Sequence, residues 1–425
     1  MRRGLIAIML ALLTGVCTAD DWPDWRGPNR DAVSTETDLL TEWDEGGPPL
    51  AWMTTGIGAG YSGVVVADNR IYTLGESTGQ CVFTALDYKS GNRLWSTYVD
   101  NHRPNATPLV DGDLAFALGY KGNLVAVKSA TGEELWRINL HKAFRGKTQT
   151  DCGYSESPLV DGDRLVCTPG GKDAAVVALN KYTGTVMWKS TLPEGIGERG
   201  ADGSGYSSIV VSTAAGVRHY VVLTGRGALG ISPKDGVVLW TYNRVANEHA
   251  NVATPIVHGD FLFFSTAYQT GSALVKIVRN DAANGDPSAS PIRAEEVYFL
   301  APKVLQNHHG GLVRVGDHIY GGHGHNKGFP VCVEVSTGTM LWEPQRGPGS
   351  GSAAVMYADG HLYFHYENGV MALIEADPTA YKLKGSFKVP GSSEKSWSHP
   401  VISGGRLFIR EENTLHCYDV RRPQS

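Results

Sequence analysis

Short apolar runs and tight polar turns alternate along the whole chain. The stretch from Asn105 to Leu140 shows this most clearly, with apolar runs in ATPLV, LAFALG, GNLVAVKS and ELWRINL. Asp111-Gly112-Asp113 separates the first two runs and Gly132 lies in the turn before the last, and such residues tolerate positive φ. No long segment repeats its apolar positions with a helical period. The pattern therefore predicts many short strands and few helices.

The turn before the last run recurs, each time with a tryptophan four residues after its glycine. The copies end at Trp95, Trp136, Trp188, Trp240 and Trp342. Counting from Trp52, the intervals are 43, 41, 52, 52 and 102 residues, and the last equals two periods with the middle tryptophan missing. A period of roughly 40–50 residues with four short strands per unit is typical of a β-propeller.

Counting units predicts an all-β fold with eight blades. Seven units are expected to be complete, with outer strands near Trp95, Trp136, Trp188, Trp240, Phe299, Trp342 and Phe387. The eighth shows three strands before the chain ends, so the strand at 48–53 is predicted to pair with it and close the ring. The fifth unit differs most: it carries a polar insertion at 280–291, and Tyr298-Phe299 replaces the tryptophan.

The repeated indoles suggest how the blades hold together. A blade has two apolar faces and cannot bury both alone. Each tryptophan is expected to reach the neighbouring blade, pack beside the glycine of its turn and bury roughly 150–250 Å². The predicted docking residues are Trp52, Trp95, Trp136, Trp188, Trp240 and Trp342.

The N-terminus has the pattern of an export signal. Arg2 and Arg3 precede an apolar stretch, and small residues at 17 and 19 favour cleavage after Ala19. The alternative is a lipid anchor on Cys17, although Val16 stands where such motifs carry a small residue. The apolar stretch is too short for a membrane span, and no later segment could cross a bilayer. We expect a protein of the periplasm or cell envelope, divided into signal peptide 1–19, extension 20–47, propeller 48–421 and tail 422–425.

Net charge limits the classes of binding partner, and the cysteines limit the possible disulfides. The full sequence has a net charge of −5, and removal of the two signal arginines makes it more negative. This argues against nucleic acid or anionic lipid as a general partner. Beyond Cys17, the five cysteines are irregularly spaced. Cys152 and Cys167 are the nearest pair for a disulfide, and unpaired buried thiols are the favoured alternative for most. The chain is expected to be a monomer.

The repeated Thr/Ser-Gly-x-x-x-Trp motif resembles the tryptophan-docking repeat of the PQQ-like propeller family, over essentially the whole mature chain. The opening DWPDWRGPNRDAVS also resembles exported members from planctomycete-type bacteria. The resemblance implies one of two functional classes. Some members are dehydrogenases that bind pyrroloquinoline quinone and Ca²⁺, and others, such as the BamB-type lipoproteins of outer-membrane assembly, are scaffolds that bind protein strands.

Polar and aromatic residues precede the innermost strands, where they would meet at the mouth of the central channel. Such a ring is the default candidate for a binding site, although similar residues would also fill a wet tunnel without binding anything. The candidates are Tyr61, Arg103, Asn105, Tyr154, Glu156, Tyr206, Asn251, His308, His309, Trp397 and His399.

On the quinoprotein alternative, Glu156 and Asn105 would hold the cation and Trp397 or Tyr206 would stack on the quinone. The adjacent cysteine pair of such enzymes is absent from the sequence, as is a CxxCH haem motif. His308, His323 and His325 form a weaker candidate for a metal site. The sequence therefore favours a binding or scaffold module that takes a small molecule or peptide at the channel mouth and a cell-envelope protein at its rim. No cofactor is predicted for that role.

Overall fold

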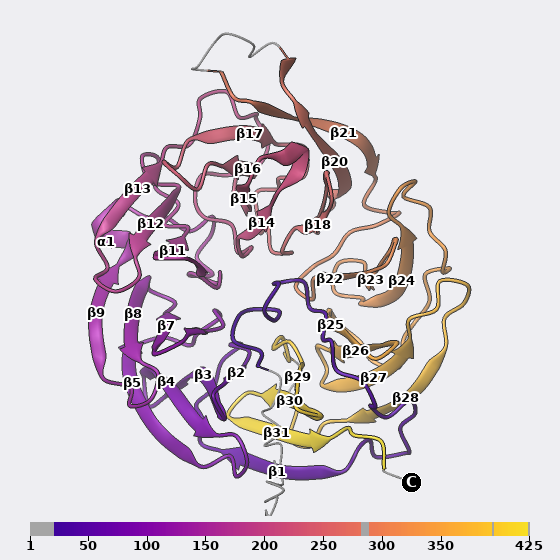
Figure 1. Cartoon of the computed structure of the whole chain (residues 1–425). Helices are drawn as coiled ribbons and strands as arrows, with labels where there is room; N and C mark the ends of the chain where they lie inside the picture. The colour runs from indigo at the N-terminus through magenta and orange to yellow at the C-terminus, as the bar shows by residue number, and fades with distance from the viewer. Residues whose placement is uncertain (1–20, 282–288, 393–394, 424–425) are drawn as a thin grey trace, which may run out of the picture.

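Eight small antiparallel sheets surround a central axis in this computed structural model, as Figure 1 shows. The structure describes residues 21–281, 289–392 and 395–423. The predicted signal peptide and Cys17 lie outside the described residues. The prediction of an all-β, eight-bladed propeller is confirmed. Within the described ranges the helices are one short α-helix, α1 (Leu140–Phe144), and one 3₁₀ turn, η1 (Ala214–Gly216).

Each of the first four blades is a four-stranded meander that runs from the channel outward. Blade 1 consists of β2 (Val65–Ala67), β3 (Arg70–Ser77), β4 (Gln80–Asp87) and β5 (Arg93–Asp100). Blade 2 consists of β6 (Leu109–Asp111), β7 (Leu114–Leu118), β8 (Asn123–Lys128) and β9 (Glu134–Asn139). Blade 3 consists of β10 (Leu159–Asp161), β11 (Arg164–Cys167), β12 (Val176–Asn180) and β13 (Val186–Ser190). Blade 4 consists of β14 (Val210–Ser212), β15 (His219–Thr224), β16 (Gly227–Ile231) and β17 (Val238–Tyr242).

The last four blades are less uniform. Blade 5 consists of β18 (Ile256–His258), β19 (Phe261–Thr266), β20 (Gly271–Arg279) and β21 (Ile292–Leu300). Blade 6 consists of β22 (Leu312–Val315), β23 (His318–His323) and β24 (Phe329–Glu334). Blade 7 consists of β25 (Ala353–Ala358), β26 (His361–Tyr366), β27 (Val370–Glu375) and β28 (Leu383–Lys388). Blade 8 consists of β29 (Val401–Ser403), β30 (Arg406–Glu411), β31 (Thr414–Asp419) and the N-terminal strand β1 (Leu50–Thr55).

The N-terminal strand closes the ring as predicted. Strand β1 pairs antiparallel with β31, with Trp52 opposite Cys417 and Thr55 opposite Thr414. Figure 1 shows the two ends of the chain, indigo and yellow, side by side in this blade. The pairing covers an edge that an open array of blades would leave exposed.

Blade 6 corrects the expectation that seven units have four strands of their own. Its sheet has three strands, and Met340 forms a single bridge to Val333 where a fourth strand was expected. Pro344 follows closely, and proline cannot donate a ladder hydrogen bond, so the strand cannot continue. Trp342 nevertheless remains buried, and its indole N–H donates to the main-chain oxygen of Asp377 in the next blade (2.9 Å).

Four of the predicted indoles lie on the turn glycine of the next blade. A Cβ atom added at Gly91, Gly132, Gly184 or Gly236 would come closer than 3.0 Å to the ring of Trp52, Trp95, Trp136 or Trp188, respectively. All four glycines have positive φ, near 70°. Glycine is therefore required twice, for the turn and for the close approach of the indole.

Trp240 does not follow this pattern. Its ring covers Gly230 of its own sheet and contacts His219 edge-on at 5.8 Å. The reason is the insertion in blade 5, which lengthens β20 and β21 and removes the short glycine turn on which Trp240 would dock. Glu296 of β21 instead receives hydrogen bonds from Tyr242 and Arg244 across the same interface.

All five cysteines of the described residues are free thiols. Four lie buried on strands, and Cys152 is exposed in a loop, so Cys152 and Cys167 are not joined. The structure therefore has the alternative in which the cysteines are unpaired thiols.

The extension that precedes β1 crosses the centre of the ring, where Figure 1 shows it in indigo. Trp22 bridges to Val66 in blade 1, Val33 to Tyr357 in blade 7, and Leu39 to Arg421 after blade 8. Trp43 then donates its main-chain N–H to Lys384 on β28 (2.9 Å). The extension is therefore part of the packed structure.

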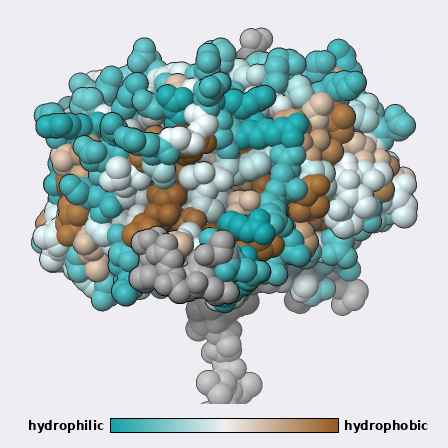
Figure 2. Space-filling view, turned by 90° about the horizontal axis from the view of Figure 1, so that it is seen from above, coloured by the Kyte–Doolittle hydropathy of each residue, from teal (hydrophilic) through white to brown (hydrophobic). Residues whose placement is uncertain are grey.

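The outer wall of the disc is mixed in character. Figure 2 views the wall on the side of β17 and β21 and shows hydrophobic areas between hydrophilic ones. Large apolar side chains on outermost strands are about half exposed, among them Leu50 (49%) and Met53 (51%) on β1 and Leu94 (49%) on β5.

Candidate functional site

Residues 21–34 form a plug across one end of the central channel. The main-chain oxygen of Pro23 accepts from Val110 in blade 2 (2.8 Å), and Ser34 donates its N–H to Tyr357 in blade 7 (2.8 Å). Arg26 and Arg30 have positive φ (61° and 57°), which winds the plug into tight turns. The plug thus touches opposite sides of the ring and closes the channel from one face.

Two arginines hold the plug from within. Arg30 is 4% exposed and binds both carboxylate oxygens of Asp24 (2.8 Å each) and the main-chain oxygen of Pro158 (2.8 Å). Arg26, also 4% exposed, donates to the main-chain oxygen of Leu312 in blade 6. Burial raises the pKa of Asp24 and the charge of Arg30 opposes that shift. The ion pair therefore lies within the plug, and Arg30 links the plug to blade 3 through the main-chain oxygens of Ser157 and Pro158.

Above the plug lies a cavity of about 610 Å³, called the funnel below. Its wall is rich in rings, which come from the loops before the innermost strands, from turns between the second and third strands of blades 2, 5 and 6, and from the plug itself. The aromatic and imidazole residues that line it are Trp25, Tyr61, Tyr120, Tyr206, Tyr268, His308, His309, His325, Trp397 and His399. The volume suits a small molecule or the end of a peptide.

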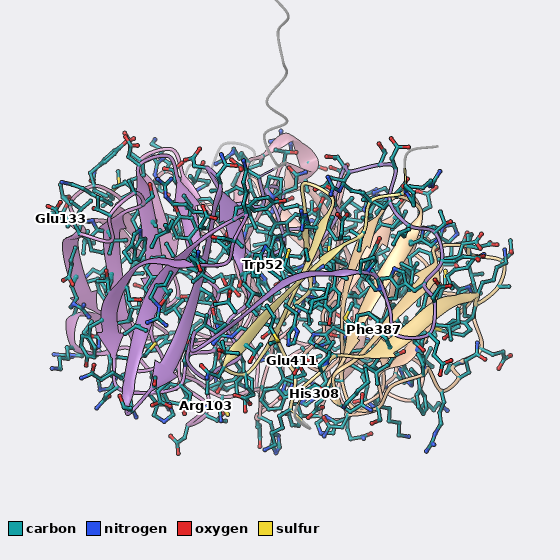
Figure 3. All side chains as sticks on the ribbon, turned by 90° about the horizontal axis from the view of Figure 1, so that it is seen from below. Trp52, Arg103, Glu133, His308, Phe387 and Glu411 are labelled. Atoms are coloured by element: carbon teal, nitrogen blue, oxygen red, sulfur yellow. The ribbon has the colours of Figure 1, made fainter. Side chains whose placement is uncertain are left out.

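The rings of the wall contact one another in sequence. Tyr61 lies 4.5 Å from Trp397 between ring centroids, and Trp397 lies 4.4 Å from His309. His309 stacks on His308 at 3.5 Å, and His308 lies 4.3 Å from His325. Figure 3 places His308 and Arg103 toward the same face of the disc. The contacting rings therefore form a continuous run along one side of the funnel, from Tyr61 to His325.

Three imidazoles of the funnel wall, those of His308, His309 and His399, are neutral near pH 7. Burial lowers the pKa of His309 and of His399 to about 3, with neighbouring cationic groups adding to the effect. Burial also strongly lowers the pKa of His308, and the next contributions come from His309 and His325. Hydrogen bonds fix the His308 ring between Ser352 Oγ (2.8 Å) and Tyr268 Oη (3.0 Å).

Seven of the residues predicted from the sequence line the funnel. They are Tyr61, Asn105, Tyr206, His308, His309, Trp397 and His399. Asn105 donates to Cys152 O (2.8 Å) and Ser155 Oγ (3.0 Å). Tyr206 shares a hydrogen bond with Thr150 Oγ1 (2.6 Å).

The other four predicted residues lie outside the lining. Arg103 lies over the Tyr61 ring at 5.0 Å and forms an ion pair with Glu412 (2.6 Å). Tyr154 is buried, with its hydroxyl on Pro169 O (2.9 Å). Asn251 is fully buried and donates to Thr224 O (2.9 Å). These three residues brace the wall from outside the cavity.

Glu156, the fourth, points into the protein beside the channel. It is 1% exposed, Oε1 accepts the N–H of Thr168, and Oε2 has no hydrogen-bond partner within the described residues. Burial raises the pKa of Glu156 to about 7, against hydrogen bonds from Thr168 that lower it. Such a carboxyl cannot reach a ligand in the funnel.

The calcium ligands named for the quinoprotein alternative do not fit this arrangement, although Trp397 and Tyr206, the residues named for stacking on the quinone, both line the funnel. Glu156 lies outside the funnel, and the Asn105 amide is engaged with its neighbours. Nor does any group of three or more His, Cys, Asp or Glu side chains across the described ranges have a geometry that could hold a metal ion. His308, His323 and His325 are not such a group: His323 is outside the lining, where its Nδ1 accepts from Gln306 N–H (3.3 Å).

Several lining residues were not predicted. Trp25 and Arg26 come from the plug, Tyr120 from the turn after β7, and Tyr268 from the β19–β20 turn. Tyr268 has positive φ (55°), rare for an aromatic residue, which turns its ring toward His308. The short alternation of strand and turn around Tyr120 and Tyr268 could have indicated that these residues lie in turns at the channel mouth. The sequence of the plug gives no such indication.

The fold and the repeats define an eight-bladed propeller of the PQQ-like class, with one end of its channel closed and a ring-lined funnel at the other. The chain belongs to the family described as outer membrane protein assembly factor BamB, whose profile matches residues 28–151 and 108–344. These two matches cover more than half of the chain.

Curated relatives of the same name agree with this assignment. A protein named outer membrane protein assembly factor BamB from Burkholderia pseudomallei is 27% identical over 62% of this chain and 64% of its own length. Proteins of the same name from Yersinia pestis and Shewanella oneidensis are matched over 37% and 55% of their lengths. The chain therefore spans less than two thirds of each of these three curated relatives.

Two crystal structures share the fold at low sequence identity. BamB from Moraxella catarrhalis aligns with a TM-score of 0.59 at 13% identity, over 88% of this chain and 100% of its own. Quinohemoprotein alcohol dehydrogenase from Comamonas testosteroni aligns with a TM-score of 0.63 at 13% identity, over 96% of this chain and 82% of its own. Both likenesses concern architecture alone. Across the described ranges, no helix has the length and apolarity needed to cross a membrane.

Proposed function

We propose that this protein is an exported binding module of the cell envelope, whose funnel holds a small molecule or the end of a peptide. The observation that carries the proposal is a cavity of about 610 Å³, walled by contacting aromatic rings and closed at its floor by the plug. A cavity of this size that concentrates aromatic surface around a few polar groups has the properties of a ligand site.

The packing around the funnel favours ligand binding over two other roles, passage of a molecule through the channel and catalysis. Residues of the plug bind main-chain groups of blades 2, 3, 6 and 7, so a ligand would enter and leave by the same mouth. The imidazoles of His308 and His309 are neutral near pH 7 and held by hydrogen bonds or ring contacts, as in a preorganised binding surface.

The experiment is a ligand screen on the purified protein. A library of neutral, anionic and cationic fragments would be screened by ligand-observed NMR, and hits would be titrated against Trp397→Ala. Tyr182→Ala serves as the matched control, because Tyr182 is a 54% exposed aromatic residue on the outer surface. We expect hits that Trp397→Ala weakens at least tenfold and Tyr182→Ala leaves unchanged. A screen without any hit sensitive to Trp397 would refute the proposal.

A partner protein is proposed for the outer wall. The names of the relatives describe assembly of outer membrane proteins, and the outermost strands expose Leu50, Met53 and Leu94 to about half. A photo-crosslinking residue at Met53, compared with one at the exposed polar Glu133, tests this in intact cells. Crosslinks from position 53 to one envelope protein are expected, and equal labelling from both positions would contradict the proposal.

A further inference from the structure

Arg26 is the charged residue at the floor of the funnel. Its Nη2 donates to the main-chain oxygens of Asp31 (3.3 Å) and Leu312. Its Nη1 lies beside Gly311, a lining residue, since a Cβ at Gly311 would be 2.5 Å from it. Within the described part of the chain, Nη1 has no hydrogen-bond acceptor. A buried guanidinium therefore presents an open donor at the base of the cavity.

The charge of Arg26 is only partly compensated. Burial lowers its pKa to about 10, against the charge of the exposed Asp31, which raises it, so Arg26 stays cationic at neutral pH. No carboxylate of the described residues forms an ion pair with it. Arg30, four residues later and equally buried, has Asp24. Arg410, which is 2% exposed, directs both Nη1 and Nη2 at oxygen atoms of blade 1 and its preceding loop. A buried cation without an anion is costly, and an incoming anion would offset that cost.

The other charged residues of the funnel do not pair with Arg26 at its base. Its remaining charged residues are Asp151, Glu367 and Lys395, all more exposed than Arg26. Glu367 Oε2 accepts the N–H of Ser352 (3.0 Å). Above the floor, the contacting rings of Tyr61, Trp397 and His309 form an apolar wall. An anion acceptor at the base and flat surfaces above it define a two-part site.

On the basis of the proposed binding role, we propose that the funnel selects ligands with a carboxylate that reaches Arg26 and a planar apolar body that lies against the wall. An Arg–carboxylate contact is charge-assisted and directional, so it would fix the ligand's orientation. Both a small aromatic acid and the C-terminal residue of a peptide have this chemistry. The test separates these two sources.

Calorimetric titration of the purified protein would use two matched pairs of probes. The first pair is 2-naphthoate and 2-naphthamide, and the second is the tripeptide Ala-Ala-Trp with a free or an amidated C-terminus. Loss of a charge-assisted hydrogen bond weakens binding by about tenfold or more. We expect that loss for the amide in at least one pair, and the pair that shows it identifies the source.

Variants then assign the effect to Arg26. Arg26→Gln is expected to abolish the preference for the acid, and Arg26→Lys to retain part of it. Arg103→Gln is the matched control, because Arg103 is a cation near the mouth that does not line the funnel. The comparison of acid and amide on the unmodified protein decides the question even if Arg26→Gln fails to fold.

The outcomes separate this inference from the proposed function. Acid and amide that bind equally, with affinities that depend on Trp397, would overturn the role of Arg26 and leave the binding function intact. An acid preference that Arg103→Gln removes as fully as Arg26→Gln would also overturn it. If neither these probes nor the fragments bind, both proposals fall.

Discussion

The ring of Phe387 on β28 packs against the backbone of Gly47, which has a φ of 83°. Gly47 precedes β1, so this contact joins blade 7 to the N-terminal strand of blade 8. It repeats the contact of Trp95 with Gly132, with a phenyl ring in place of the indole. The closing interface of the propeller is thus built like the others, although its two halves come from opposite ends of the chain.

Substitution of Gly47 by alanine should destabilise the ring at this closing contact. Strain at positive φ costs roughly 1–2 kcal/mol, and displacement of the phenyl ring adds about 1–3 kcal/mol. Gly46→Ala is the control, because Gly46 also has positive φ (108°) and no atom within 4 Å of the added Cβ. Urea denaturation should show the larger loss in unfolding free energy for Gly47→Ala. Equal losses for the two variants would mean that the Phe387 contact is not significant.

Tyr298 provides a second test of the docking pattern. It contacts Gly338 as the indoles contact their glycines, and its hydroxyl donates to Val335 O (2.7 Å), much as Trp95 Nε1 donates to Ser129 O (3.0 Å). Tyr298→Phe keeps the ring and removes the hydrogen bond, so a loss of about 1 kcal/mol in unfolding free energy is expected. Tyr98→Phe, at a 48% exposed tyrosine, should change it little. If Tyr298→Phe leaves the unfolding free energy unchanged, the ring of Tyr298 and not its hydrogen bond contributes to the contact between blades 5 and 6.

The blades were predictable because their signals are local. A glycine four residues before an indole specifies turn, strand and neighbour together, and it occurs in five of the units. The exceptions follow from changes in the turns: the blade 5 insertion leaves Trp240 without a docking glycine, and Tyr298, not Phe299, takes the contact with Gly338. Pro344 ends blade 6 early, an effect visible in the sequence only when the strand register is known.

The funnel was only partly predictable, for two physical reasons. In extended chain, side chains alternate between two sides, so Ser155 lines the funnel while Tyr154 and Glu156 turn away from it. The sequence predicted that this segment lies at the channel mouth, but it did not determine which of its side chains face the channel. The plug is the second reason. Arg26 contacts Leu312, 286 residues away. Residues 21–34 contain no repeat or period from which that contact could be predicted.

The buried pair Asp24–Arg30 should contribute more to stability than a surface pair. Arg30→Met would leave Asp24 buried without its cation, at a cost of about 3–5 kcal/mol. The double variant Asp24→Asn/Arg30→Met should regain part of that loss. Lys128→Met, in the exposed pair with Glu133 (49% and 59% exposed side chains), should cost less than about 1 kcal/mol. A double-mutant cycle by urea denaturation measures the coupling, and a coupling near that of the surface pair would show that this ion pair stabilises the plug no more than a surface pair would.

Glu156 should make the protein less stable as pH rises. Its pKa is raised from 4.5 to about 7 in the folded state, so between these values the folded state holds a proton that the unfolded state has lost. Stability from this group is therefore fully present below pH 4.5 and is lost as pH rises through 7. The shift corresponds to at most about 3 kcal/mol. Glu156→Gln keeps a neutral side chain of similar shape and should remove this dependence.

The measurement is the difference in unfolding free energy between Glu156→Gln and the unmodified protein at several pH values. That difference should favour the variant increasingly from pH 5 to pH 8 and then level off. Asp235→Asn, at an exposed carboxyl whose pKa is lowered by hydrogen bonding to Ser232, should not show this rise. A flat difference for Glu156→Gln would mean that the carboxyl ionises at its ordinary pH. In that case a charged Glu156 would be stabilised by its hydrogen bonds from Thr168 and then by the charge of Arg30, both of which lower its pKa.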